Sequence, residues 1–144
     1  MQINIINHSQ FPLPEYATAH SAGLDLRANL VSPIVIKPLE RFLAPTGLYI
    51  ELPEGYEAQV RPRSGLAIKQ GISIVNAPGT IDPDYRGEIK VILVNLSDIP
   101  VTIESGDRIA QMVISKFEHI SWNKVESLTP SQRAEGGFGH TGFK

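Results

Sequence analysis

The chain has no cysteine among its 144 residues, and this absence excludes several kinds of protein. Without cysteine there is no disulfide framework, no thiolate zinc site and no cysteine nucleophile. Long hydrophobic runs are missing too: no apolar stretch approaches the roughly 20 residues that a membrane-spanning helix needs. We therefore expect a soluble protein that folds around a hydrophobic core and has no membrane partner.

A large excess of charge of one sign is also missing. The formal net charge is −2 at pH 7, and charged residues make up 19% of the chain. Proteins that bind a nucleic-acid polymer usually carry a strongly basic face, so we expect no such partner. The first residues, MQINIINHSQ, form neither a basic leader nor an apolar stretch of signal-peptide length. We expect an intracellular, cytoplasmic protein.

Helical periodicity is nearly absent, whereas short runs rich in Val and Ile are broken by Pro, Gly and Asp. This pattern predicts an all-β sandwich or barrel. Residues 48–62 are expected to form two strands around a turn at 53–55, residues 71–79 a strand followed by turn residues, and residues 88–120 three strands. The turns of the last segment are expected near Ser97-Asp98 and Ser105-Gly106-Asp107. The length favours a single domain, 1–144. Within it we expect a β core at 1–130 and a C-terminal arm at 131–144.

The segment PRSGLA, residues 62–67, predicts the start of the one short helix, SGLAIKQ. Ser64 is its expected N-cap and Gly71 its stop. Such a start presents backbone N–H groups to an anion, and Arg63 adds a cation whose fork matches phosphate oxygens. An ordinary capped helix with a surface arginine explains the same residues.

The segment NAPGTIDPDYRGEI, residues 76–89, contains two carboxylates separated by a proline, Asp82 and Asp84. A carboxylate in such a loop is a candidate base for a water molecule. The alternative is a polar turn between two strands, with Tyr85 as a half-buried anchor.

Glycine, scarce in folded strands, is concentrated at the end of the chain: four of the twelve glycines lie in the last twelve residues. The segment RAEGGFGHTG, residues 133–142, mixes them with Arg133, Phe138 and Thr141. A frayed terminus is one interpretation. The other is a lid, in which arginine meets phosphate, phenylalanine stacks on a flat ring, and glycine lets the backbone approach closely.

Together and in this order, the segments resemble the motifs of the trimeric dUTP diphosphatase (dUTPase) family. The five motifs are SAGLDLRA (21–28), PRSGLA (62–67), NAPGTIDPDYRGEI (76–89), GDRIAQMVI (106–114) and RAEGGFGHTG (133–142). They span almost the whole chain, and their order and spacing are more specific than any one of them. The resemblance implies a jelly-roll-like β-barrel with one short helix. It also implies a homotrimer with active sites between subunits, each closed by a flexible, glycine-rich C-terminal arm.

The reaction implied by the resemblance is hydrolysis of dUTP to dUMP and pyrophosphate. Asp82 matches the general base that activates the attacking water at the α-phosphorus. A carboxylate is ionised at neutral pH but is a weak base, so positioning and charge neutralisation must supply most of the acceleration. Ser64 and Gln111 would contact the α- and β-phosphates, and Arg133 and Thr141 the outer phosphates.

The same resemblance implies a Mg²⁺ cofactor. The sequence has no carboxylate cluster spaced for an all-protein metal cage, and Mg²⁺ commonly binds through substrate phosphates and water. We expect no direct protein ligand, with Asp25 in a supporting network of water and hydrogen bonds. Arg63 and Gly65 would assist at the start of the helix.

Specificity is expected from other residues. By resemblance, Asn76 and the hairpin leading to Asp82 read the edge of uracil, Tyr85 packs under the deoxyribose, and Phe138 stacks on the base, with Gly139 beside it in the substrate-binding arm. A tight hairpin can exclude the thymine methyl group, and unpaired polar atoms would penalise cytosine. Asp107 and Arg108 are explained equally well by a turn with a structural salt bridge.

Two other functions are weighed against this one. A dCTP deaminase shares the fold but needs a glutamate where alignment on Gly87 puts Ile92, and it tends to carry tryptophan where Tyr85 stands. A non-catalytic nucleotide-binding domain would have lost Asp82 or the arm, and both are present. The sequence therefore favours the enzyme.

Overall fold

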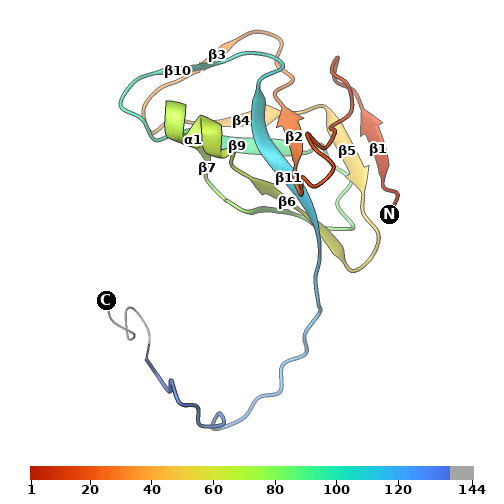
Figure 1. Ribbon diagram of the computed structural model, residues 1–144, viewed down its shortest axis with the longest axis vertical. Coiled ribbons are helices and arrows are strands. Elements are labelled where there is room, and N and C mark those ends of the chain that lie inside the picture. Colours follow the sequence, from red (N-terminus) through yellow and green to blue (C-terminus); the bar gives the residue numbers. More distant parts are fainter. Residues whose placement is uncertain (137–144) are drawn as a thin grey trace.

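The computed structural model describes residues 1–136, in which every regular element except one short helix is a β-strand (Figure 1). The first strands are β1 (Asn4–Asn7), β2 (Leu24–Arg27), β3 (Ile34–Ile36), β4 (Arg41–Pro45), β5 (Leu48–Glu51) and β6 (Tyr56–Arg61). After the helix α1 (Ser64–Gln70) come β7 (Ile72–Ile74), β8 (Gly79–Ile81), β9 (Lys90–Asn95), β10 (Val101–Ile103) and β11 (Arg108–Lys116). The expected all-β fold with one short helix is confirmed.

The strands form four antiparallel sheets arranged as a jelly-roll-like barrel. The larger sheets have the orders β2-β11-β6-β8 and β4-β9-β7, and the pairs β1-β5 and β10-β3 complete the structure. Most neighbours within the sheets are far apart in sequence, as β2 and β11 illustrate. Residues from both ends of the chain are therefore brought to the same sheet.

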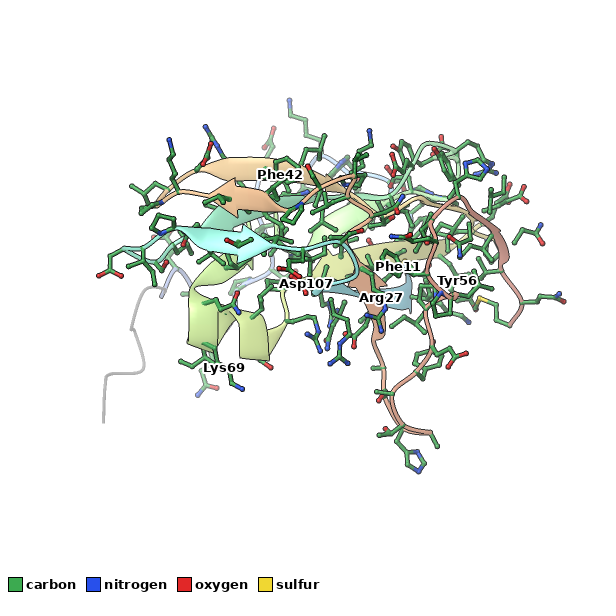
Figure 2. All side chains as sticks on the ribbon, turned by 90° about the horizontal axis from the view of Figure 1, so that it is seen from above. Phe11, Arg27, Phe42, Tyr56, Lys69 and Asp107 are labelled. Atoms are coloured by element: carbon green, nitrogen blue, oxygen red, sulfur yellow. The ribbon has the colours of Figure 1, made fainter. Side chains whose placement is uncertain are left out.

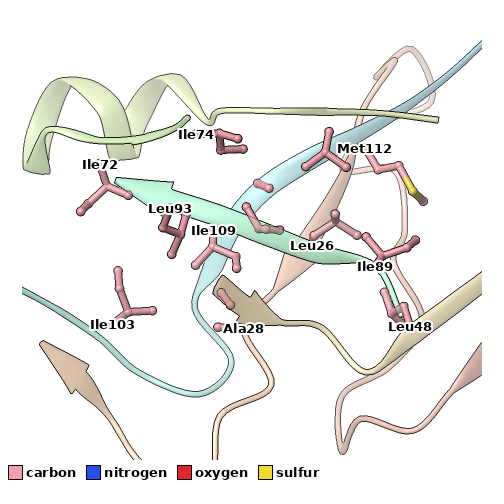
Figure 3. Packing of buried hydrophobic residues seen from close by; sticks show 14 of the residues in the cluster. Leu26, Ala28, Leu48, Ile72, Ile74, Ile89, Leu93, Ile103, Ile109 and Met112 are labelled. Carbon is pink, nitrogen blue, oxygen red and sulfur yellow. The ribbon is translucent and has the colours of Figure 1, made fainter. Parts of the chain in front are cut away.

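The core lies between the sheets because buried and open positions alternate along the strands. In β9, Val91, Leu93 and Asn95 are buried, while the residues between them face outward. Figure 3 shows Leu26 and Ile109 beside Leu93 in the packed cluster, contributed by β2, β11 and β9. The buried Asn95 amide donates to the carbonyls of Ile36 and Ile99, at 2.9 and 2.7 Å, so its polar group is paired.

Most expected elements are confirmed. The turn at 53–55 joins β5 to β6, and residues 88–120 contain the three strands β9, β10 and β11. The segment 71–79 is different, because β7 ends at Ile74 and Gly79 already begins β8. β8 was not expected, since it has only three residues and begins with glycine.

The helix begins and ends close to the expected residues, with one correction. Gly71 ends α1 in the left-handed conformation, with φ of +67°. The N-cap is Arg63 and not Ser64, which is the first helical residue, and no side chain caps the helix. Figure 2 shows Lys69, in the last turn of α1, pointing away from the sheets.

After β11 the chain leaves the barrel (Figure 1). Residues 117–136 form no helix or strand, and most of their apolar side chains are exposed, with Trp122 at 90% and Leu128 at 86%. The division between core and arm at residue 130 stays a prediction. No helix within residues 1–136 has the length and apolar character to cross a membrane.

Candidate functional site

A pocket of about 320 Å³ lies beside the loop that follows β8. Its lining includes three of the predicted site residues, Asn76, Asp82 and Tyr85. It also includes six residues that were not predicted: Leu43, Thr80, Ile81, Glu88, Lys90 and Ile92. Asp82 is an exposed residue that lines this pocket, so solvent can reach it.

The loop from Asp82 to Glu88 is tightly folded. The Tyr85 N–H donates to the Asp82 carbonyl at 3.2 Å, and the Tyr85 hydroxyl donates to the Glu88 carbonyl at 3.1 Å. Gly87 lies under the ring, where a Cβ atom would overlap the Tyr85 phenol. The Tyr85 ring therefore has its position because residue 87 has no side chain.

Arg86 holds this loop from the outside. Its Nη1 donates to the carbonyls of Pro83 and Tyr85, at 2.6 and 3.0 Å, and its Nη2 forms an ion pair with Glu51 on β5 at 3.3 Å. The loop that carries Asp82 is thus fastened to a neighbouring strand. Sequence reasoning missed Arg86, because its carbonyl partners and Glu51 come together only in the folded chain.

A second cluster of predicted residues surrounds Asp25 on β2. Arg63 Nε donates to Asp25 Oδ1 at 2.8 Å, and Arg108 Nη1 donates to Asp25 Oδ2 at 3.1 Å. Arg63 Nη1 also donates to the Arg108 carbonyl at 3.3 Å. The Asp25 side chain is 19% exposed, so this charged group is held mainly by protein.

The salt bridge of Arg108 agrees with the structural alternative stated for that residue. Asp107 closes its own turn, because its Oδ2 accepts the Glu104 N–H at 2.8 Å. Arg27 ties the same turn to β2 by donating to the Gly106 carbonyl at 2.7 Å, and Figure 2 shows Arg27 on this side of the molecule. These contacts explain both residues without a ligand.

Gln111 lies in the middle of this second cluster. It is the cross-strand partner of Asp25 on one side and of Arg61 on the other, so the three side chains share one face of the sheet. A Cβ at Gly23 would meet Gln111 Oε1 at 3.3 Å, so a glycine there leaves room for the amide. The exposed residues Ser64 and Gly65 are the third and fourth residues after β6.

Within one chain the two clusters are apart. Ile81 pairs with Ala58, so Asp82 comes level with Glu57, whereas Gln111 pairs with Arg61 at the other end of β6. Four residues of strand separate these levels, about 13 Å at roughly 3.3 Å per residue. The structure therefore brings Asn76, Asp82 and Tyr85 together, and Asp25, Arg63 and Gln111 together, but not the two sets.

The predicted residues of the arm are only partly described. Arg133 Nε donates to the Gly136 carbonyl at 2.8 Å, a contact within the arm. Phe138, Gly139 and Thr141 lie outside the described residues.

The described part of the chain contains no cluster of three or more His, Asp or Glu residues that could hold a metal ion. Asp25, the carboxylate expected in a supporting role, already faces two arginines. That a metal is held by substrate phosphates and water stays a prediction.

Comparison with known proteins agrees with the resemblance found in the sequence. The dUTPase family model matches residues 9–142. The chain belongs to the dUTPase family. It is 57% identical, over 99% of its length and 100% of the relative, to a deoxyuridine 5'-triphosphate nucleotidohydrolase of Finegoldia magna. It is 60% identical to the enzyme of the same name from Cytophaga hutchinsonii, over 97% of this chain and 91% of that one.

The fold is also found in a solved dUTPase. The structure of a Staphylococcus bacteriophage 80alpha dUTPase with dUPNHPP superimposes with a TM-score of 0.88 at 26% identity. The match covers 98% of each chain. The jelly-roll-like dUTPase fold expected from the sequence is thereby confirmed.

Proposed function

We propose that this protein hydrolyses dUTP to dUMP and pyrophosphate in the cytoplasm. Two relatives that carry the name of this activity are 57% and 60% identical to the chain. The observation that carries the proposal is the exposed residue Asp82 in the lining of a pocket that also contains Asn76 and Tyr85. The reaction would limit uracil incorporation into DNA and supply dUMP for thymidylate synthesis.

In the proposed mechanism, Asp82 accepts a proton from a water molecule as that water attacks the α-phosphorus. The new bond joins the water oxygen to the α-phosphorus. The bond that breaks joins this phosphorus to the oxygen bridging to the β-phosphate, and pyrophosphate leaves with the bonding electrons. The Arg86 contacts with Pro83, Tyr85 and Glu51 support this role, because they fix the loop from which Asp82 must aim the water.

Charge neutralisation is assigned to the second cluster and to the arm. Gln111 and Ser64 would donate to the inner phosphates, with the Gly65 backbone beside them. Arg63 and Arg108 share the single Asp25 carboxylate, so the three side chains together carry a net charge of about +1 that could face the phosphates. Arg63 keeps a fixed position through Asp25, and we assign it to orientation of the phosphate site. Arg133, Phe138, Gly139 and Thr141 would close the site from the arm.

Mg²⁺ fits this arrangement as a partner of the triphosphate. When bound, the ion would neutralise phosphate charge and hold the phosphates in one conformation. We propose that the ion is held by the phosphates and by water, with Asp25 in a supporting hydrogen-bond network.

The separation of the two clusters supports a site shared between copies of the chain. Asp82 and Gln111 of one chain lie at levels of β6 that are about 13 Å apart, too far for both to serve the same reacting phosphate. A second copy can supply the missing half. We therefore propose a homotrimer in which one chain supplies the Asp82 pocket, another the Gln111 cluster, and an arm closes each site.

The test of the proposed function is release of pyrophosphate from dUTP, dTTP, dCTP and UTP in the presence of Mg²⁺. We expect rapid release from dUTP and, from each of the other three, a kcat/KM lower by about 100-fold or more, as expected where polar pairing and steric exclusion select the base. Ammonia release from dCTP is measured in parallel. Equal rates with all four nucleotides, or ammonia from dCTP, would contradict the proposal.

A further inference from the structure

Two apolar side chains that lie outside the five sequence motifs line the pocket beside Asp82: Leu43 from β4 and Ile92 from β9. We propose that this pair is the apolar wall against which the nucleoside part of the substrate packs, so that it sets affinity for the nucleoside but not for the phosphates. The inference rests on the proposed function, since it concerns the same pocket.

The strand register determines the face of the sheet to which the Leu43 and Ile92 side chains point. Leu43 and Ile92 are direct partners across the antiparallel strands β4 and β9, so their side chains lie side by side on one face. Their neighbours Ala44 and Val91 are also partners, and both are buried in the core. Since successive side chains of a strand point to opposite faces, Leu43 and Ile92 face outward into the pocket.

The exposure of the pair leaves apolar surface for a ligand. Leu43 is 53% exposed, and Ile92 is partly buried beside it. A flat pyrimidine or the carbon face of a deoxyribose would cover this surface and remove it from water, which is favourable in proportion to the area buried.

Some polar groups of the same pocket already have hydrogen-bond or ion-pair partners within the protein. The Glu88 carboxylate accepts the Gly47 N–H at 2.8 Å and forms an ion pair with Lys90 at 3.4 Å. The Tyr85 hydroxyl donates to the Glu88 carbonyl. Asn76 and Asp82 occupy exposed positions, so polar recognition at the edge and apolar packing on the wall are carried by different residues.

The experiment measures steady-state kinetics of Leu43→Ala and Ile92→Val with dUTP, together with inhibition by inorganic triphosphate. Leu96→Ala is the matched control, because Leu96 is 62% exposed, follows β9 and does not line this pocket. We expect Leu43→Ala to raise KM for dUTP about tenfold with kcat within about twofold, since uniform binding is lost. Ile92→Val should raise KM about two- to threefold, because it removes one methylene group.

Inhibition by inorganic triphosphate distinguishes a loss of nucleoside binding from a loss of phosphate binding. The inhibition constant of inorganic triphosphate should be the same in the wild type, Leu43→Ala and Leu96→Ala. An unchanged KM in Leu43→Ala, an equal loss of affinity for triphosphate, or an equal effect in Leu96→Ala would overturn the inference. A wild-type protein that releases no pyrophosphate from dUTP would instead overturn the proposed function, so the two failures are distinguishable.

Discussion

The Asp82 pocket and the Asp25 cluster are built in different ways. The pocket has one short loop at its centre, in which Asp82, Tyr85 and Glu88 contact each other within a few residues of sequence. The Asp25 cluster depends on long-range pairing, because Arg63 and Arg108 reach Asp25 across 38 and 83 residues. The loop that carries the proposed base is thus built largely from local contacts, whereas the ion pairs of the Asp25 cluster require the register of three strands.

The substitution expected to have the largest effect tests the Asp82 pocket. Asp82→Asn should reduce kcat for dUTP by about 10²- to 10⁴-fold, because the water loses its proton acceptor while the pocket keeps its shape. Binding of dUPNHPP, measured by calorimetry, should stay within a few-fold of wild type. Near-normal turnover in this variant would show that Asp82 is not the base.

The arm is tested next, by ending the chain after Pro130. We expect the core to fold and assemble normally, since the described strands end at Lys116, and kcat/KM to fall about 100-fold because the proposed lid is lost. Circular dichroism and analytical ultracentrifugation control for folding and assembly. Full activity in the truncated protein would exclude the lid.

Mixing two inactive variants tests whether the two halves come from different chains. Asp82→Asn lacks the proposed base and Gln111→Ala lacks a proposed phosphate contact. If sites are shared between chains, a mixed oligomer contains sites that combine the intact half of each variant. Random exchange of subunits between equal amounts of the two variants should restore about a quarter of wild-type activity. Each site has about an even chance of an intact Asp82 half and an independent, about even chance of an intact Gln111 half. Activity that stays at the level of the separate variants after exchange would indicate that both halves belong to one chain.

The same contrast explains what could be predicted from the sequence. The loop at Asp82 and the helix stop at Gly71 were predictable, because proline, aspartate and glycine act locally through backbone conformation. The outward pair Leu43 and Ile92 was not, since its position follows from the pairing of β4 with β9. Arg86 was missed for a similar reason: its carboxylate partner Glu51 lies on a different strand, 35 residues away.

The helix start gives an intermediate case, because its location was predictable and its cap was not. Ser64 has the side chain expected of an N-cap, yet Arg63 takes that position with φ of −93° and ψ of 126°. The Arg63 side chain is held by Asp25, a contact from another strand that the local pattern does not contain. The helix therefore begins one residue earlier than the capping pattern predicts.

The smallest expected effect is that of a substitution at Gly65, the second residue of α1. It distinguishes a role of this glycine in folding from a role in substrate binding. A Cβ at Gly65 would meet no atom within 4 Å in the chain, so alanine fits there and should leave stability unchanged or raise it by about 0.5–1 kcal/mol. If the glycine lets phosphate approach the backbone closely, Gly65→Ala should still lower kcat/KM for dUTP several-fold. Thermal unfolding and pyrophosphate release are measured on the same sample. A parallel loss of stability and activity would assign Gly65 a structural role, whereas a loss of activity at unchanged stability would support close approach of the substrate to its backbone.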